Sequence, residues 1–184
     1  DISNAMPPGG EGLNKSDPRV AKLMNQQKQM IVSMGQFLGE EVLHVMRGMQ
    51  RTDSDVQIYG GQKTISCPGR ERTNSGRAGF EGTYKEGPPV EIRLGLLKFD
   101  DIVIGAVNAE VFNPIAQRLK HESPYTATMM ATLTNGMARS GYIPHDAGYG
   151  MYTFEVLSSR LKPGCAETSI VNGILDLISE SRKR

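Results

Sequence analysis

The chain has 184 residues, a net charge of +1 and a hydrophobic content of 38%. This length is enough for one domain with a full core, and the composition is typical of a globular protein rather than a disordered one. The near-neutral charge gives no electrostatic surface for nucleic acid, so we expect no nucleic-acid partner. The most apolar stretch, residues 94–107, contains Lys98, Asp100 and Asp101 and is too short and too charged to span a bilayer.

The first 16 residues are expected to be a lead-in outside the folded part, which we place at residues 17–184. Residues 3–5, Ser-Asn-Ala, precede Met6 and resemble the scar left by a cleaved expression tag. Residues 7–12 are rich in proline and glycine, a flexible loop composition that does not resemble a signal peptide. Because the chain begins in a loop and enters a long helix, we expect it to be the second part of a larger domain.

A long amphipathic helix is predicted after this lead-in. Asp17 is suited to cap the helix and Pro18 to occupy its first turn. Apolar residues then recur at helical spacing over about thirty residues, or roughly 45 Å. Gly35 and Gly39 cost about 1 kcal/mol each relative to alanine and suggest that another element packs closely there. Five methionines on the helix are assigned to core packing rather than to an exposed binding face. They are Met24, Met30, Met34, Met46 and Met49.

Three strands are predicted before residue 100. Alternating apolar and polar residues favour short strands at 56–59 and 63–67 and a longer strand at 90–99. Residues 68–89 between them are polar and rich in glycine, and a connection of this length in a compact domain is usually functional or disordered. We therefore expect residues 68–89 to form a surface flap at the edge of a site.

Two apolar runs follow and are predicted to be buried strands. Residues 102–107 are rich in β-branched side chains, and the Asp100-Asp101 turn joins them to the preceding strand as a hairpin. Residues 128–133 form the second run. A helical pattern lies between the two runs, and another helix is predicted at 168–179. These elements predict an α/β fold, with a mixed β-sheet flanked by helices and one long N-terminal amphipathic helix.

Two polar side chains follow the buried strands. Glu110 stands where the strand at 102–107 ends and a helix begins, and Tyr142 follows the next strand. Ligands of open α/β sheets bind beyond the carboxyl ends of the strands, so both side chains are expected at one edge. The alternative is that Glu110 caps the helix and Tyr142 is an ordinary loop residue. His145 is close to Tyr142 in sequence, and its simplest interpretation is a hydrogen-bonding loop residue.

The sequence contains no complete catalytic set. The three histidines, His44, His121 and His145, form no His-x-His or His-x-x-x-His pair, so no self-contained zinc site is expected. There is also no Gly-x-Ser-x-Gly nucleophile motif. Cys67 and Cys165 either form a disulfide or remain as two buried free thiols, and the cysteines therefore do not decide the compartment.

The segment from Ile102 to Glu155 resembles the neutral/alkaline, non-lysosomal ceramidases, zinc-dependent amidases that cleave the N-acyl bond of ceramide. The resemblance rests on a strand, a turn with a carboxylate, a helix with a basic segment, an Asn-rich turn, a Tyr-Ile segment, and spaced Tyr and Glu. In this chain these parts are Asn108-Ala109-Glu110, Gln117-Arg118-Leu119, Asn135, Tyr142-Ile143, Tyr149 and Glu155. The long helix resembles the segment that follows the catalytic serine in that family.

The resemblance implies a role for six residues: Glu110 and Tyr142 would be zinc ligands, and Tyr149, Phe154, His145 and Asn135 would line the substrate site. It implies that two histidine ligands and the serine nucleophile lie upstream, in a missing N-terminal half of the domain. Phe154 departs from the family, which tends to carry a second site tyrosine there, so that hydrogen bond to the substrate is lost. We expect zinc in the complete enzyme, and neither tight zinc binding nor amide hydrolysis by this chain alone.

The resemblance also implies the partners. The substrate would be an N-acylated sphingoid lipid or a related amide, and the protein partner would be the missing N-terminal half. The alternative interpretation is a non-catalytic α/β scaffold or oligomerisation module, in which Glu110 caps a helix and the long helix pairs with a copy of itself in a homodimer. The compartment stays open, with export of the full-length protein as one option.

Overall fold

The structure, a computed structural model, describes residues 16–49, 54–75 and 78–183. The expected tag scar and nearly all of the lead-in lie outside the described residues. The chain divides into two compact units, Asp1–Ser54 and Asp55–Arg184. The elements of these units confirm the predicted α/β class, with a mixed sheet, flanking helices and one long N-terminal helix.

The first unit contains the predicted long helix, α1 (Pro18–Gly48). The Asp17 carboxylate accepts a hydrogen bond from the backbone N–H of Arg19 at 2.8 Å, which confirms the predicted cap. None of the α1 side chains is buried, so the assignment of its methionines to a core is wrong. The reason is that α1 is the only helix or strand in the described part of its unit, where no second element can cover it.

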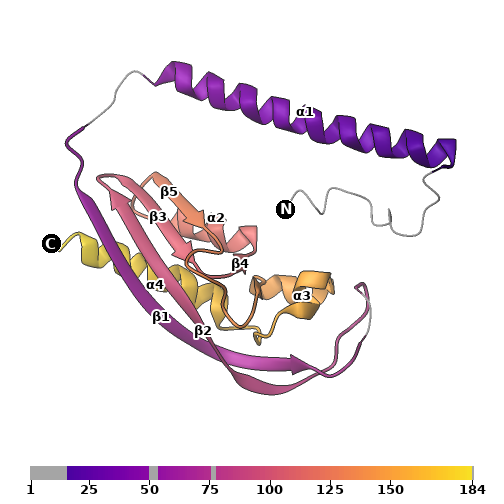
Figure 1. The fold of residues 1–184 in the computed structure, drawn as a ribbon. Coiled ribbons are helices and arrows are strands. Elements are labelled where there is room, and N and C mark those ends of the chain that lie inside the picture. The colour runs from indigo at the N-terminus through magenta and orange to yellow at the C-terminus, as the bar shows by residue number, and fades with distance from the viewer. Residues whose placement is uncertain (1–15, 50–53, 76–77, 184) are drawn as a thin grey trace. The chain divides into compact units, whose positions relative to one another are not determined.

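The second unit is built on a four-stranded sheet with the order β1-β2-β3-β5 (Figure 1). The strands β1 (Ile58–Arg72), β2 (Tyr84–Phe99) and β3 (Ile102–Val107) are antiparallel neighbours. The strand β5 (Ala127–Ala131) lies parallel to β3 at the edge. The predicted hairpin is therefore confirmed, because β2 and β3 pair directly across their two-residue turn.

Half of the expected flap at 68–89 is regular strand, in the ends of β1 and β2, so the prediction of a connection over this whole range is wrong. One strand, β1, replaces the two short strands predicted at 56–59 and 63–67, and its ladder with β2 continues as far as Arg72↔Tyr84. Proline usually ends a strand because it has no N–H to donate. Here the register shifts between Cys67 and Gly69, and this bulge accommodates Pro68 without ending the ladder.

Among the described residues of the second unit, the long helices cover one face of this sheet. The helices α2 (Asn113–Glu122) and α4 (Ala166–Ser181) pack on that face and on each other. Buried residues therefore alternate with more exposed ones along β3, which is not buried on both faces as expected. β5 is likewise an edge strand whose Met129 is 47% exposed, so the expectation of a second buried strand is wrong.

The core fills the space between the sheet and the two helices. From β2, Val90, Ile92 and Leu94 are at most 1% exposed, and Ile174 of α4 is fully buried. A Cβ added at Gly105 of β3 would lie 3.0 Å from a methyl carbon of Ile174. The strand thus passes directly beneath α4, and a larger side chain at Gly105 would separate them.

Short elements complete the unit. β4 (Glu110–Val111) and β6 (Tyr142–Ile143) form a second, two-stranded sheet. A 3₁₀ helix, η2 (Asp146–Met151), and the short helix α3 (Phe154–Ser158) follow β6. None of the helices in the described ranges is long and apolar enough to cross a membrane.

A strap formed by residues 159–165 holds the last part of the chain against β1. The backbone N–H of Arg70 donates to the carbonyl of Arg160 at 2.7 Å, and that of Lys162 donates to Pro68 at 3.0 Å. A disulfide joins Cys67 to Cys165, which decides between the two alternatives that the sequence left open. The bond links β1 to the residue that precedes α4.

Removing the disulfide should destabilise the second unit. The bond closes a loop with a sequence separation of 98 residues, and loss of a native disulfide of this kind typically costs about 2–5 kcal/mol. We expect the double variant Cys67→Ala/Cys165→Ala to unfold at lower urea concentration than the oxidised protein. A reducing agent should shift the parent midpoint and leave the variant midpoint unchanged; equal midpoints for the two oxidised proteins would contradict the prediction.

Gly69→Ala should destabilise the long hairpin. A Cβ at Gly69 would lie 1.9 Å from the carbonyl oxygen of Pro88, a backbone atom that cannot move without breaking the ladder. We expect a loss of about 1–3 kcal/mol in the free energy of unfolding. Gly60→Ala is the matched control, because a Cβ there meets nothing within 4 Å. Similar urea midpoints for the two variants would show that the bulge is not tightly constrained.

Candidate functional site

The structure pairs Glu110 with Tyr142. These residues are direct partners in the parallel β4–β6 ladder, so their side chains leave the ladder on the same side. Glu110 donates its backbone N–H to Gly141 at 2.9 Å, and Phe112 donates to Ile143 at 3.0 Å. We call Glu110 and Tyr142 the half-site.

Neither part of the alternative interpretation of these two residues fits the structure. Glu110 does not cap the following helix, because it lies in β4 and the N-cap of α2 is Phe112. Tyr142 lies in β6 rather than in a loop. The helix begins later than its apolar pattern suggested, because Val111 belongs to the β4–β6 ladder and Pro114 supplies a first-turn proline.

Asn108 positions the half-site. This residue is only 4% exposed, and its side-chain oxygen accepts a hydrogen bond from the backbone N–H of Arg93 at 2.8 Å. Its backbone carbonyl accepts from Ala138, and its N–H donates to the carbonyl of Arg93. These bonds tie the end of β3 to β2 and to the loop at 132–141. Because Glu110 is two residues further on, they fix where β4 begins.

The loop at 132–141 carries a concentration of unusual backbone conformations. Leu133 and Asn135 both have φ of +55°, and Gly136 has φ of +107°. Left-handed conformations cost energy for residues other than glycine, and they persist where the surrounding structure imposes them. Here Leu133 donates to the carbonyl of Ala109, and a guanidinium nitrogen of Arg93 donates to the carbonyl of Asn135.

The surroundings of Tyr142 disfavour its charged form. Its ring meets that of Phe154 edge to face, with ring centroids 5.9 Å apart. Burial raises the pKa of the Tyr142 phenol, and the negative charges of Glu110 and Glu155 raise this pKa further. The phenol is therefore protonated at neutral pH. A cation bound beside the two carboxylates would act in the opposite direction and favour the phenolate.

The other residues that the resemblance assigned to the site are distributed more widely. Phe154 contacts Tyr142 directly. His145 lies beside the ring of Phe112, with centroids 6.0 Å apart, and its Nδ1 is buried without a hydrogen-bond partner among the described residues. Tyr149 contacts Arg70, whose guanidinium carbon is 4.9 Å from the centre of the tyrosine ring.

Arg70 forms a cluster that the sequence analysis did not find. Its guanidinium lies 3.7 Å from the ring centre of Tyr84 and donates to the carbonyls of Val156 and Ser159. Burial lowers the pKa of Arg70 and raises that of Tyr149. The only signal in the sequence was one more arginine in the expected flap, and the bulge that turns this side chain inward is not visible there. The cluster anchors the distal hairpin to the segment that carries Phe154.

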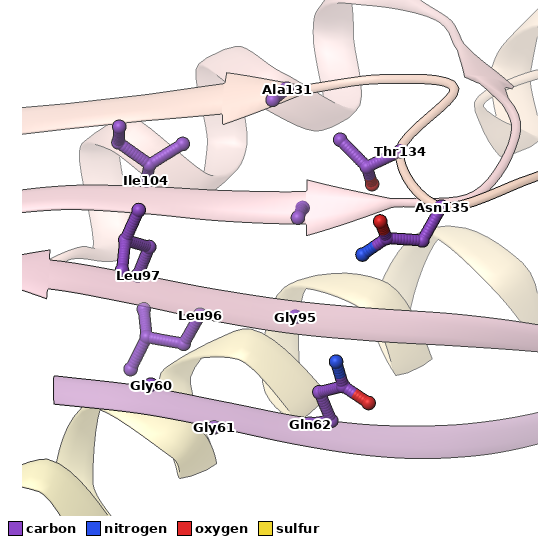
Figure 2. A pocket seen from close by; sticks show the side chains of 11 residues that line it. Gly60, Gly61, Gln62, Gly95, Leu96, Leu97, Ile104, Ala131, Thr134 and Asn135 are labelled. Carbon is purple, nitrogen blue, oxygen red and sulfur yellow. The ribbon is translucent and has the colours of Figure 1, made fainter.

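Asn135 lies at one end of a trough on the uncovered face of the sheet (Figure 2). The trough has a volume of about 560 Å³, and Gly95, Ala106 and Ala131 form part of its floor. Figure 2 shows the side-chain amides of Gln62 and Asn135 at the same end, with α4 behind the sheet. The strained loop therefore reaches both the trough and the half-site.

The half-site supplies oxygen ligands only. No group of three or more His, Cys, Asp or Glu side chains suited to a metal ion occurs in the described ranges. The carboxylates of Glu110 and Glu155 around Tyr142 nevertheless create a negative field that suits a cation. A zinc site needs nitrogen or sulfur donors in addition in most cases, so these residues fit one side of a coordination sphere.

Comparison of the chain with protein-family models, with curated proteins and with solved structures finds no match.

The Tyr142 phenol provides a direct test of this electrostatic arrangement. Glu110→Gln should lower the pKa of Tyr142 toward its ordinary value, because it removes a negative charge that disfavours the phenolate. Titration of ¹³Cζ-labelled tyrosine by NMR can follow this group separately from the other five tyrosines. Glu91→Gln, on the exposed surface of β2, is the matched control. An unchanged pKa in Glu110→Gln would show that the two side chains do not interact.

Proposed function

We propose that this chain is part of a zinc-dependent amide hydrolase that resembles the neutral ceramidases. The observation that supports this most strongly is the pairing of Glu110 with Tyr142 in the β4–β6 ladder. The two residues are 32 positions apart in the chain, and the resemblance implies that they bind one metal. A shared ladder position brings two side chains close enough to bind the same ion.

In this proposal, each half-site residue has a distinct task. Glu110 supplies a carboxylate ligand, and its position is fixed through the backbone by Asn108 and the 132–141 loop. Tyr142 supplies a phenol oxygen that becomes a good ligand once its proton is lost. Phe154 packs edge to face on Tyr142 and orients its ring. Bound zinc would polarise the amide carbonyl of the substrate and lower the pKa of the attacking group.

The nitrogen ligands and the nucleophile would come from polypeptide outside this chain. The described residues provide no histidine pair with the spacing of a zinc motif, and His145 is the histidine nearest to Tyr142 in sequence. A half-site that lacks these donors cannot complete a catalytic zinc sphere. We therefore infer that this chain alone binds zinc weakly and is inactive as an amidase.

The proposed substrate class is an N-acylated sphingoid lipid or a related amide. The trough supports this class, because its floor is apolar and its end carries the amides of Gln62 and Asn135. An alkyl chain fits the apolar part, and an amide can hydrogen-bond to the polar end. The 132–141 loop connects this end to the half-site through the hydrogen bond from Leu133 to Ala109.

The decisive experiment compares this chain with a longer polypeptide that would carry the proposed histidine ligands and serine. Zinc content and hydrolysis of an N-acyl sphingoid substrate should both be present in the longer polypeptide and absent from this chain. Glu110→Gln and Tyr142→Phe in the longer polypeptide should each remove most of the bound zinc and the activity. Glu91→Gln, whose side chain lies on exposed β2, should preserve both.

Two outcomes would contradict the proposal in different ways. Stoichiometric zinc in this chain alone, lost on Glu110→Gln, would show that the half-site is sufficient for binding. Zinc and amidase activity that survive both substitutions in the longer polypeptide would make Glu110 and Tyr142 structural residues.

A second candidate function is a non-catalytic oligomerisation module. The observation that favours it is α1, a 31-residue helix with no buried side chain. In this interpretation the exposed apolar residues of α1 bind a partner, and the β4–β6 ladder only stabilises the fold. The non-catalytic role of the ladder excludes the amidase proposal, whereas oligomerisation through α1 is compatible with it, because the half-site and α1 belong to different compact units.

A further inference from the structure

The loop at 132–141 contains a residue pair that favours a spontaneous covalent change. Asn135 is followed by Gly136, and both residues are exposed to water. The nitrogen of a peptide group can attack the side-chain amide of the asparagine that precedes it. Glycine obstructs this attack least, because it has no Cβ and allows the backbone to rotate most freely. The pair is therefore a candidate for deamidation, the conversion of asparagine into aspartate or isoaspartate.

The structure places a cation at the peptide group that joins the two residues. A guanidinium nitrogen of Arg93 donates a hydrogen bond to the backbone carbonyl of Asn135. The same nitrogen would lie 3.1 Å from a Cβ at Gly136, so it is next to both residues. Loss of the Gly136 amide proton leaves a negative charge that the peptide nitrogen shares with this carbonyl oxygen. A cationic donor at the oxygen stabilises the charge as it forms.

The backbone around the pair leaves room for the reaction. Asn135 and Gly136 both have positive φ, and residues 132–137 belong to no helix or strand. Closure of a ring between the Gly136 nitrogen and the Asn135 side chain requires rotation of the backbone at Asn135. In this loop the rotation breaks no helical or strand ladder, and water reaches the reacting atoms.

A second Asn-Gly pair in the same chain has the opposite setting. Asn172 and Gly173 lie within α4, where backbone N–H groups are held in the helical hydrogen-bond ladder. Gly173 is also buried, and a Cβ there would lie 2.5 Å from a methyl carbon of Leu94. Rotation of the backbone at Asn172 would have to break α4 above the core. The chain therefore carries its own reference for the same dipeptide in a protected position.

We propose that Asn135 is a site of spontaneous deamidation, at which the Arg93 guanidinium promotes the reaction by stabilising the deprotonated peptide group. The Gly136 nitrogen gives its proton to the solvent and attacks Cγ of Asn135. The bond from Cγ to the side-chain nitrogen breaks, and this nitrogen takes a proton from the solvent and leaves as ammonia. Water then opens the cyclic imide at either carbonyl. The net reaction exchanges ammonia for water and needs no oxidant or metal.

The two products change the surroundings of the trough in different ways. Aspartate keeps the backbone and replaces a neutral amide by a carboxylate at the end of the trough (Figure 2). Isoaspartate also lengthens the backbone by a carbon atom, within the loop whose hydrogen bonds hold Asn108 and Ala109. Deamidation thus alters the charge of the trough and, through isoaspartate, the support of Glu110. This inference goes beyond the amidase proposal and does not depend on it.

The test is a time course of the oxidised full chain at neutral and at mildly alkaline pH, followed by reduction, trypsin digestion and mass spectrometry. Asn135 and Asn172 fall in separate tryptic peptides, residues 121–139 and 161–182. The first peptide should gain the mass difference between a hydroxyl and an amino group at least about tenfold faster than the second. Its rate should rise with pH, because the attacking nitrogen must lose a proton. Asn135→Asp supplies the standard for the aspartate product.

Arg93→Gln tests the role of the guanidinium. The hydrogen bonds of Arg93 with Asn108 are made by its backbone and do not need the side chain. We expect Asn135 to deamidate about fivefold more slowly in this variant, which corresponds to about 1 kcal/mol of lost stabilisation. Lys98→Gln is the matched control, because it removes one positive charge from the other end of the same strand. The rate at Asn172 monitors folding and should stay low in both variants.

Two results would overturn the proposal. Equal rates at Asn135 and Asn172 in the parent chain would show that the loop protects its pair as well as the helix does. A rate at Asn135 in Arg93→Gln that equals or exceeds that of Lys98→Gln would show that the guanidinium does not promote the reaction.

Discussion

The hydrogen bonds of one buried amide hold the candidate site together. Asn108 joins the end of β3 to β2 through its side chain and to the 132–141 loop through its carbonyl. An unpaired buried amide would cost several kcal/mol, so these partners must all be present in the folded state. The consequence reaches both strands of the small sheet, because the residues before Glu110 and the residues before Tyr142 are fixed by the same group.

The one-sided covering of the sheet explains how the second unit can combine a firm core with an open face. The helices α2 and α4 bury most of one face, and Gly105 allows β3 to lie close beneath them. The other face keeps the trough and leaves Leu97 and Met129 partly exposed. This division places the packed core on one side of the sheet and the open trough on the other.

The two units differ in the kind of partner that we propose for each. In our proposal for the second unit, the half-site supplies oxygen ligands and a negative field around Tyr142, and a cation with nitrogen donors from elsewhere completes it. In the first unit the exposed apolar residues of α1 have no cover among the described residues, and the second candidate function supplies a second surface for them. Our proposals assign a different partner to each because the chemistry that is lacking differs.

The sequence by itself determined the α/β class, the long helix with its Asp17 cap, and the hairpin of β2 and β3, because these depend on periodicity and on contacts between near neighbours. It also placed Glu110 and Tyr142 at strand ends, and the structure pairs them in one ladder. Only the tertiary structure decided that β1 continues through the Pro68 bulge, that Arg70 lies between two tyrosines, and that the cysteines are bonded. The tertiary structure also decided which apolar residues are buried. An apolar pattern shows that one face of an element needs to be covered, but it does not show whether another element covers that face. For that reason the methionines of α1 and the edge strand β5 were misjudged, whereas the elements themselves were found.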